Sequence, residues 1–367
     1  MKAIRLRTAS LLEPRGSDIR NPVFSWNCEG GLRQTAYRVV VKRGEEILFD
    51  TGKVESSSME AAYAGKPLNS RDVVIGEITL YDENGKEGTP ASTFFEMGLL
   101  HKADWKAKWI RGDYRPKDKK PFIAPYMGKA QRKEKVDYFQ KTFEVKSIQK
   151  ARLYITALGL YEIHINGNRV GDFVMAPGYT DYTKRVQYQT YDVASLLQTG
   201  TNVIEAKLAD GWYRGSTGAW GIWCQYGRVT KLLAQLEITD EEGKAAMVIT
   251  DASWRWSNDG PIVIADNKDG EVIDARLSPT YAGKAKQSRH NVIPSASNNT
   301  SVKEHEAFVP RLSKTPSGKY LLSFPQNLAG FIAFRVEAKE GDRIKIRCGE
   351  LVGEDGELNQ KNIQLER

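Results

Sequence analysis

Hydrophobic and polar side chains alternate along the stretch from residue 151 to residue 165. Leu153 and Ile155 fall on one face of this pattern, and the positions between them fall on the other face. Alternation with a period of two, rich in β-branched and aromatic residues, predicts β-strands. The dipeptide Asn166-Gly167 then precedes a second run, Arg169–Phe173, and it tolerates the positive φ angles of a tight hairpin turn. The stretch therefore predicts a strand, a turn and a second strand.

Similar short runs recur along the whole chain, separated by turns rich in Gly, Asn and Asp. We expect further strands over residues 21–26, 35–41, 46–50, 73–81, 138–145, 186–193, 203–208, 232–238, 245–249 and 254–256. No long helical periodicity interrupts them. Close, regular spacing of short strands with turn signals between them predicts antiparallel sandwiches. The expected fold class is all-β, with tandem antiparallel β-sandwiches.

The chain of 367 residues is too long for one ordinary sandwich. We expect a first sandwich over residues 1–103 and a larger sandwich over residues 104–282. Residues 283–301 are small, polar and basic, which predicts a linker. A further β-domain is expected to begin near residue 302 and to be incomplete at residue 367.

Several segments closely resemble α-L-rhamnosidases, a family of bacterial glycoside hydrolases. The segments LYITALGLYEIHINGNRVGD, APGYTDYTKRVQYQTYDV and LADGWYRG follow one another as in the N-terminal domain of that family. The segments PVFSW, QTAYRV, DTGKV, WKAKWI, GEVIDAR and FPQNLAG extend the resemblance over nearly all of the chain. The resemblance implies a fibronectin type III-like module, then a jelly-roll N-terminal domain, then the start of the next rhamnosidase β-domain.

The resemblance also bears on catalysis. Members of the family are inverting glycosidases whose two catalytic carboxylates lie in an α/α barrel that follows the β-domains. Inversion needs two carboxyl groups about 6.5–9.5 Å apart with a water molecule between them. Because no run of amphipathic helices is present, we assign no catalytic residue and expect this chain alone to be inactive. The whole enzyme would hydrolyse terminal α-L-rhamnosides, and the alternative is a stand-alone carbohydrate-binding or scaffold protein.

The net charge of +8 raises the question of nucleic-acid binding. Between residues 111 and 136 there are nine Lys or Arg against three Asp or Glu, so most of the surplus lies in one proline-containing segment. Without a basic helix or interleaved aromatic residues, this segment does not predict nucleic-acid binding. No apolar run approaches the roughly 20 residues of a membrane span, and no signal peptide is recognisable, so we expect a cytoplasmic protein. Cys28, Cys224 and Cys348 have no metal-ligand spacing and are expected to be reduced core residues.

Two groups of residues could bind a sugar, because an aromatic ring can stack on a sugar face while nearby polar groups contact its hydroxyls. The alternative for both groups is structural: the aromatic residues would fill the end of the sandwich, and Asp181 with Arg185 would form an internal ion pair. The candidate substrate-binding residues are Tyr179, Asp181, Tyr182 and Arg185 in the first group, and Asp210, Trp212, Tyr213 and Arg214 in the second.

No cofactor is required by any motif, and the metal question stays open. Some rhamnosidases carry a calcium-dependent rhamnose-binding module, but Thr183 and Lys184 next to Asp181 are a poor calcium environment. The acidic positions Asp266 and Asp269 are expected to form a solvated turn or, less often, a metal site. The expected partners are a rhamnose-containing glycan or glycoside and the missing catalytic barrel, and homo-oligomerisation is left open.

Overall fold

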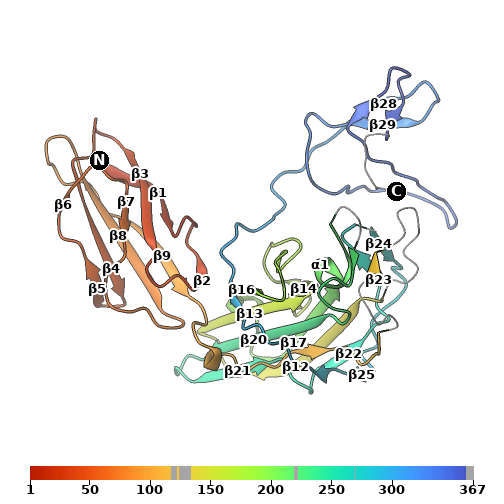
Figure 1. Cartoon of the computed structure of the whole chain (residues 1–367), viewed down its shortest axis with the longest axis horizontal. Helices are drawn as coiled ribbons and strands as arrows, with labels where there is room; N and C mark the ends of the chain where they lie inside the picture. The colour runs from red at the N-terminus through yellow and green to blue at the C-terminus, as the bar shows by residue number, and fades with distance from the viewer. Residues whose placement is uncertain (117–121, 124–133, 219–221, 269, 361–367) are drawn as a thin grey trace. The chain divides into compact units, whose positions relative to one another are not determined.

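The computed structural model describes residues 1–116, 122–123, 134–218, 222–268 and 270–360. Strands dominate the described part of the chain, where helix is limited to α1 (Gly211–Arg214) and two short 3-10 turns, Lys102–Asp104 and Ala194–Leu196. The prediction of an all-β fold built from antiparallel sandwiches is confirmed (Figure 1). No helix among the described residues has the length and apolar character that crossing a membrane requires. The chain divides into two compact units, Met1–Ser301 and Val302–Arg367, and the first unit contains two sandwiches.

The first sandwich consists of a small sheet and a larger sheet around a common core. The core contains Phe24 and Phe95 in edge-to-face contact, and the indole of Trp26, which donates to Gln34 Oε1 at 2.9 Å. Trp26 is therefore a core aromatic residue. The strands of the small sheet are, in spatial order, β1 (Lys2–Thr8), β3 (Val23–Glu29) and β7 (Glu60–Ala62). Those of the larger sheet are β2 (Arg15–Ser17), β9 (Ala91–Met97), β8 (Val73–Tyr81), β4 (Ala36–Arg43) and β5 (Glu46–Asp50), with β6 (Val54–Glu55) also on β4.

The middle sandwich has two large sheets whose inner faces share one hydrophobic core. The strands of one sheet are, in spatial order, β26 (Lys286–Gln287), β10 (Ile110–Arg111), β20 (Lys231–Thr239), β13 (Lys150–Leu158), β16 (Gln187–Asp192) and β27 (Ser295–Ala296), with β21 (Ala245–Ile249) also on β20. The strands of the other are β15 (Asn168–Arg169), β14 (Leu160–Ile165), β17 (Gly200–Ala209), β12 (Asp137–Val145), β22 (Arg255–Ser257) and β25 (Gly283–Lys284). Smaller elements close one end: β11 (Phe122–Ile123), β18 (Ser216–Thr217) and β19 (Ile222–Trp223) form one sheet, and β23 (Ile262–Asp266) pairs with β24 (Gly270–Ile273).

Strand β13 is buried on both faces, although its alternation suggested two distinct faces. Leu153 and Ile155 point into the core between the two sheets. On the opposite face, Tyr154 joins Leu99 of the first sandwich and Tyr188 in a separate apolar cluster. The outer face of this sheet is thus covered by other parts of the same unit, which explains why it carries few polar side chains.

Polar contacts join the first and middle sandwiches. Glu96 on β9 is only 1% exposed and accepts hydrogen bonds from Arg152 Nε on β13 at 2.9 Å through both carboxylate oxygens. The Tyr188 hydroxyl accepts a hydrogen bond from the backbone N–H of Leu99 at 2.7 Å. A buried carboxylate needs such charge-assisted bonds to offset its lost hydration. The two sandwiches are therefore joined by a specific ion pair as well as by apolar contact.

Two sequence-based expectations differ from the structure in the middle sandwich. The Asn166-Gly167 turn is confirmed, with both residues at positive φ, but the second strand of the hairpin ends at Arg169 and does not reach Phe173. Gly171, with φ of +67°, bends the chain away from the sheet there. Residues 283–301, predicted as a linker, instead add the short strands β25, β26 and β27 to the two large sheets. Small polar side chains suit such edge positions, which leave one side open to water.

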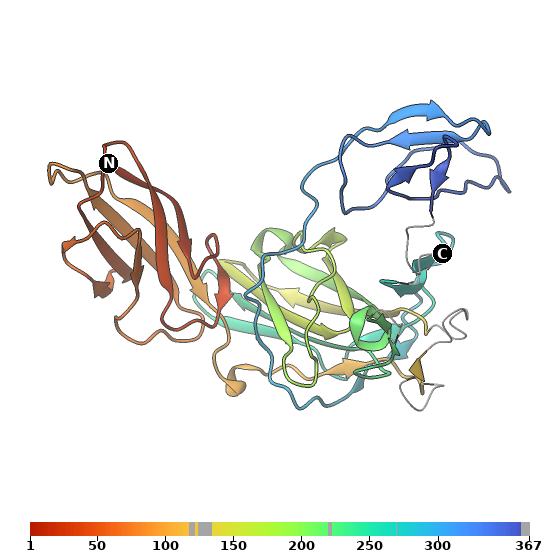
Figure 2. The ribbon, with the colours of Figure 1, turned by 45° about the horizontal axis from the view of Figure 1, so that its top comes forward.

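The second unit has short paired strands and many solvent-exposed apolar side chains. Its hairpins are β28 (Arg311–Lys314) with β29 (Tyr320–Ser323) and β30 (Leu351–Val352) with β31 (Leu358–Asn359), drawn in blue in Figure 2. Within this unit Phe331 is 68% exposed and Phe334 is 59% exposed. Cys348 is also exposed, so the expectation that all three cysteines are core residues is wrong for this one.

Candidate functional site

One end of the middle sandwich brings together aromatic side chains from three separate loops. Tyr179 lies 5.7 Å from Trp212 and 6.3 Å from Tyr226 between ring centroids, and its hydroxyl lies 2.9 Å from that of Tyr226. Tyr182 contacts Tyr213 edge to face at 5.4 Å and Tyr226 at 5.2 Å. We call these five residues the aromatic cluster. Its members range from the buried Tyr182 and Tyr213 to Tyr179, which is 52% exposed.

The loop that carries Tyr179 and Tyr182 is held by its own hydrogen bonds. The Ala176–Pro177 peptide bond is cis, and Gly178 has φ of +95°. The Tyr182 hydroxyl donates to the Gly178 carbonyl at 3.0 Å, which closes the loop on itself. The ring of Tyr179 is therefore presented at the surface by a defined backbone.

The loop that carries Trp212 and Tyr213 is the single-turn helix α1. Gly211 has φ of +52°, and a Cβ at this position would lie 2.7 Å from a side-chain atom of Leu160. At Gly215 a Cβ would lie 2.0 Å from the Asp266 carboxylate. Because both positions exclude a side chain, the glycines of the DGWYRG segment fix the turn that places Trp212 beside Tyr179.

The charged residues of the same segment point inward and not toward the aromatic cluster's surface. Asp210 and Arg214 are each 1% exposed, and Arg214 Nε donates to Asp210 Oδ1 at 2.7 Å. Arg214 also donates to the Tyr114 hydroxyl and, at 3.2 Å, to the Lys135 carbonyl. Each of the three guanidinium nitrogens thus has a partner inside the protein.

A second buried carboxylate, Asp137 on β12, lies beside this pair. It accepts hydrogen bonds from Thr230 Oγ1 at 2.6 Å, from Trp256 Nε1 at 2.8 Å and from the Tyr114 hydroxyl at 3.3 Å. We call Tyr114, Asp137, Asp210 and Arg214 the buried charge cluster. Its polar atoms are paired, as buried groups require.

Burial governs the protonation of both carboxylates. Desolvation raises the pKa of Asp210 to about 6, against the opposing effect of the Arg214 charge. Desolvation also raises the pKa of Asp137, whose hydrogen-bond donors among the described residues, Tyr114, Thr230 and Trp256, are uncharged. The cluster therefore contains more negative charge than one guanidinium offsets, and acidification relieves part of this excess.

The Asp210→Asn variant tests this pH dependence. The carboxyl of Asp210 has a pKa of about 6 when folded and about 3.9 when unfolded, so its protonation stabilises the folded state fully below pH 4, and this contribution is lost as the pH rises through 6. We expect the free energy of unfolding of the wild type, minus that of the variant, to fall by about 2–3 kcal/mol from pH 4 to pH 7. Urea unfolding at four pH values across this range measures the difference. A difference that grows with pH would show that the ion pair outweighs desolvation.

The remaining candidate residues, Asp181 and Arg185, do not pair with each other through their side chains. The Asp181 carboxylate accepts from Thr183 Oγ1 at 2.6 Å and lies 3.5 Å from the Lys184 ammonium, whereas Arg185 donates to Asn298 Oδ1 at 3.1 Å. The alternative of an internal Asp181–Arg185 ion pair is therefore wrong. Both side chains remain accessible near the aromatic cluster's loop.

The surroundings of Asp181 do not fit calcium. One of its oxygens is engaged by the Thr183 side chain, and a cation, Lys184, already occupies its neighbourhood. The expectation that Asp266 is a solvated turn residue is wrong. Asp266 is 5% exposed, and its oxygens accept hydrogen bonds from the N–H groups of Ser216 and Lys268. Asp269 lies outside the described residues. In the described part of the chain, no three His, Cys, Asp or Glu side chains gather as a metal site would need.

Sequence reasoning missed three residues of this region. Tyr226 belongs to the aromatic cluster, but it lies 13 residues beyond Tyr213 in an irregular segment with no strand pattern. Tyr114 and Asp137 lie near the two ends of the basic segment, whose most evident feature in the sequence is its excess of Lys and Arg. The only signal for Asp137 was the DYF sequence, which opens a strand with an acidic residue, and Tyr114 had no such signal. Trp220, near the second candidate group, lies outside the described residues.

Three family descriptions match the chain in succession. They are "Rha78A-like, N-terminal immunoglobulin domain" for residues 3–101, "Alpha-L-rhamnosidase N-terminal domain" for residues 146–309 and "Bacterial alpha-L-rhamnosidase concanavalin-like domain" for residues 313–367. Their order is the one that the sequence segments predicted.

Individual proteins agree with the family descriptions. An alpha-L-rhamnosidase of Formosa agariphila is 33% identical over 96% of this chain, which covers 40% of that protein. The structure of an alpha-L-rhamnosidase from Dictyoglumus thermophilum aligns over 100% of this chain and 43% of its own, with a TM-score of 0.79 and 28% identity. A Streptomyces avermitilis alpha-L-rhamnosidase complexed with L-rhamnose shares the fold, with a TM-score of 0.83 and 23% identity over 98% of this chain and 52% of its own. The chain, which spans about half or less of these relatives' lengths, belongs to the α-L-rhamnosidase family and corresponds to the β-domains at the N-terminal end of its members.

Proposed function

We propose that this chain is the non-catalytic N-terminal part of an enzyme that hydrolyses terminal α-L-rhamnosidic bonds, and that its middle sandwich binds the rhamnosyl end of the glycan. The aromatic cluster is the observation that carries the binding proposal. Tyr179 is 52% exposed, and Trp212 and Tyr226 are partly exposed beside it, which gives an apolar surface that a sugar ring can cover.

The surroundings of the aromatic cluster supply polar groups that can form hydrogen bonds with a sugar. The hydroxyls of Tyr179 and Tyr226 can exchange hydrogen bonds with sugar hydroxyls, and the partly open side chains of Asp181 and Arg185 come from the same loop. A sugar site of this kind combines one stacking surface with a few convergent polar groups. Asp210 and Arg214, which are buried, act by holding the Trp212 turn. We propose binding without calcium, since the Asp181 neighbourhood already contains Lys184.

The Trp212→Ala variant tests the proposed sugar site. We expect the 367-residue chain to bind L-rhamnose, and the variant to bind it at least about tenfold more weakly, because the stacking surface is lost. Trp212 is only partly buried, so the fold should survive the change. Isothermal titration with L-rhamnose, repeated with calcium and with a chelator, measures the affinity and its calcium dependence.

A matched control removes an aromatic ring elsewhere. Tyr320 is 72% exposed in the second unit, so Tyr320→Ala should leave rhamnose binding unchanged. Equal binding by wild type and Trp212→Ala would contradict the site. Turnover of p-nitrophenyl α-L-rhamnoside by this chain would contradict the non-catalytic role, which leaves the chemistry to another part of the enzyme.

The second unit fits a supporting role in the whole enzyme. Its exposed apolar side chains include Phe331, Phe334 and Ile344. Isolated domains rarely leave contiguous apolar surface open to water. We propose that these side chains pack against further parts of the enzyme, among them the catalytic barrel.

A further inference from the structure

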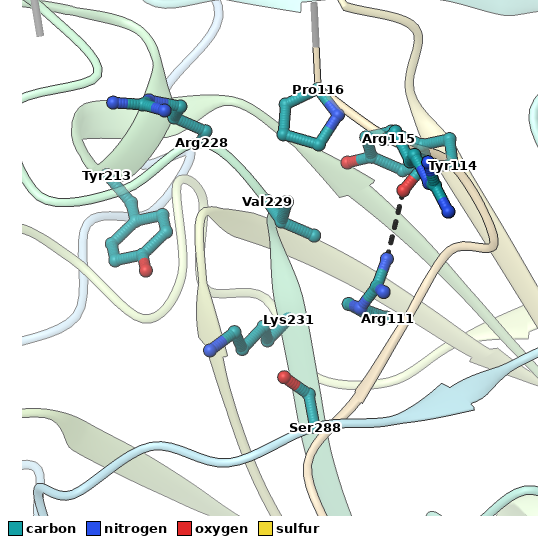
Figure 3. Close-up of a pocket in the computed structure, with 9 residues that line it drawn as sticks. All are labelled: Arg111, Tyr114, Arg115, Pro116, Tyr213, Arg228, Val229, Lys231 and Ser288. Atoms are coloured by element: carbon teal, nitrogen blue, oxygen red, sulfur yellow. Dashed lines mark hydrogen bonds between the residues drawn. The ribbon is translucent and has the colours of Figure 1, made fainter. Parts of the chain in front are cut away.

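A pocket with strongly positive walls opens in the middle sandwich, and neither Tyr179 nor Trp212 lines it. Its volume is about 360 Å³, at the lower end of the range for small-molecule sites. Among the described residues that line it, Arg111, Arg115, Arg228 and Lys231 carry positive charge, and none carries a carboxylate. Figure 3 shows Tyr213 on one side of the pocket and Arg111 and Arg115 on the other.

No carboxylate among the described residues forms an ion pair with these positive groups. Arg111 donates to the carbonyls of Gly112, at 2.9 Å, and Tyr114, at 3.0 Å, the second of which is dashed in Figure 3. Lys231 donates to the Arg289 carbonyl at 2.7 Å. Each of these side chains keeps further N–H donors, because a guanidinium has five and an ammonium has three.

The pocket's electrostatics favour an anion. Burial lowers the pKa of Lys231, and the nearby positive charge of Arg111 lowers it further. The carboxylates of Asp137 and Asp210 lie behind Tyr114, where they are bonded to Arg214, Thr230 and Trp256. Neither carboxylate is among the described residues that line the pocket.

The pocket is also joined to the proposed sugar site. Tyr213 lines it and, on its other side, contacts Tyr182 of the aromatic cluster at 5.4 Å. The remaining walls include the rings of Tyr114 and Pro116, which can cover the apolar face of a sugar. The pocket thus combines ring surfaces with donors that suit carboxylate and sulfate oxygens.

We infer that this pocket binds an acidic sugar, one whose carboxylate or sulfate group lies among Arg111, Arg115, Arg228 and Lys231. The inference deepens the proposed function, on which it rests for the idea that the ligand is a glycan. It makes the substrate class a charged, rhamnose-bearing polysaccharide, with the neutral sugar on the aromatic cluster and the acidic sugar in the pocket.

Titration of the 367-residue chain with D-glucuronate and with D-galactose 6-sulfate tests the inference, and neutral D-glucose serves as the ligand control. We expect at least one of the two acidic sugars to bind, D-glucose not to bind, and the affinity to fall as salt is raised. The two acidic probes distinguish a carboxylate from a sulfate ester as the recognised group.

The double variant Arg115→Gln/Arg228→Gln is expected to weaken acidic-sugar binding by about tenfold or more, since two charge-assisted contacts are lost. Both side chains are at least partly exposed and have no acidic partner among the described residues, so the fold should persist, which an unfolding curve verifies. Arg20→Gln removes a positive charge from an exposed position of the first sandwich and should change nothing.

Other outcomes would overturn the inference. They are no binding of either acidic sugar, an unchanged affinity in the double variant, inorganic sulfate binding as tightly as the sugars, or a single-stranded oligonucleotide binding more tightly than they do. L-Rhamnose binding, measured in the same variant, separates the two proposals: it should be retained if the aromatic cluster functions on its own. If the variant lost acidic-sugar binding but kept rhamnose binding, the proposed rhamnose site would remain supported.

Discussion

Replacing Arg214 with Met is expected to lower the free energy of unfolding of the middle sandwich by about 3–5 kcal/mol at pH 7. Arg214 is 1% exposed and, within the part of the chain that the structure describes, is the cation bonded to Asp210, which is equally buried. Met fills a similar volume but leaves Asp210 without its partner and removes a donor from the Tyr114 hydroxyl. An uncompensated buried charge costs far more than the lost contact itself.

The same variant should be less damaging in acid. Because burial already raises the pKa of Asp210 to about 6, loss of Arg214 should make this carboxyl protonate more readily still. The loss of stability at pH 5 should therefore be smaller than at pH 7. Urea unfolding followed by tryptophan fluorescence measures both values, since Trp256 donates to Asp137 in the same cluster.

The control for this prediction is an ion pair of the same type at the surface. Arg276 donates to Asp274 at 2.7 Å, but its side chain is 89% exposed. Arg276→Met should cost only a small fraction of the Arg214→Met loss, because water replaces the missing partner. Similar losses in the two variants would show that Asp210 is hydrated in solution.

The strands of this protein were largely predictable from local sequence. The runs at 46–50 and 73–81 coincide with β5 and β8, and the Asn166-Gly167 turn has the positive φ angles that its residue types allow. These features depend on side-chain period and on turn chemistry, both of which are local. The Arg169–Phe173 strand failed because Gly171 takes a positive φ, and glycine alone does not reveal which φ it will adopt.

The candidate site was predictable only in part. Residue types suggested the two aromatic groups, but their meeting depends on two loops of the folded sandwich, and Tyr226 from a third loop had no pattern to mark it. The burial of the Asp210 and Arg214 side chains could not be predicted from the sequence either. Charged residues are seldom buried, so a sequence offers no reason to place them inside until a paired partner is seen.

The buried charge cluster links the fold to the proposed sugar site. Arg214 is fixed by Asp210 and Tyr114, and the same four-residue helix carries Trp212 and Tyr213. Damage to the cluster should therefore move the Trp212 ring. Arg214→Met should weaken rhamnose binding even where the chain stays folded, although Arg214 itself does not reach the surface.

The Arg152→Met variant is expected to lower the free energy of unfolding by about 2–3 kcal/mol and to weaken the coupling between the first and middle sandwiches. Glu96 on β9 is 1% exposed and receives two hydrogen bonds from Arg152 Nε on β13, each 2.9 Å long. Lys150, at 3.2 Å, remains as a second cation after the change, so the expected loss is smaller than at Arg214. Calorimetry should show one joint transition of the two sandwiches in the wild type and two separated transitions in the variant.

A second substitution distinguishes a buried charge from simple loss of packing. Adding Glu96→Gln to Arg152→Met removes the charge that Arg152 offsets, so the double variant should recover part of the lost stability. Arg15→Met is the matched single control, because Arg15 reaches Asp192 at 3.5 Å from a position that is 40% exposed. If Arg152→Met cost no more than Arg15→Met, Glu96 would not be held by Arg152 in solution. The contact between the two sandwiches would then depend on its other parts, among them the apolar cluster of Leu99, Tyr154 and Tyr188 and the Arg71–Glu237 ion pair at 2.6 Å.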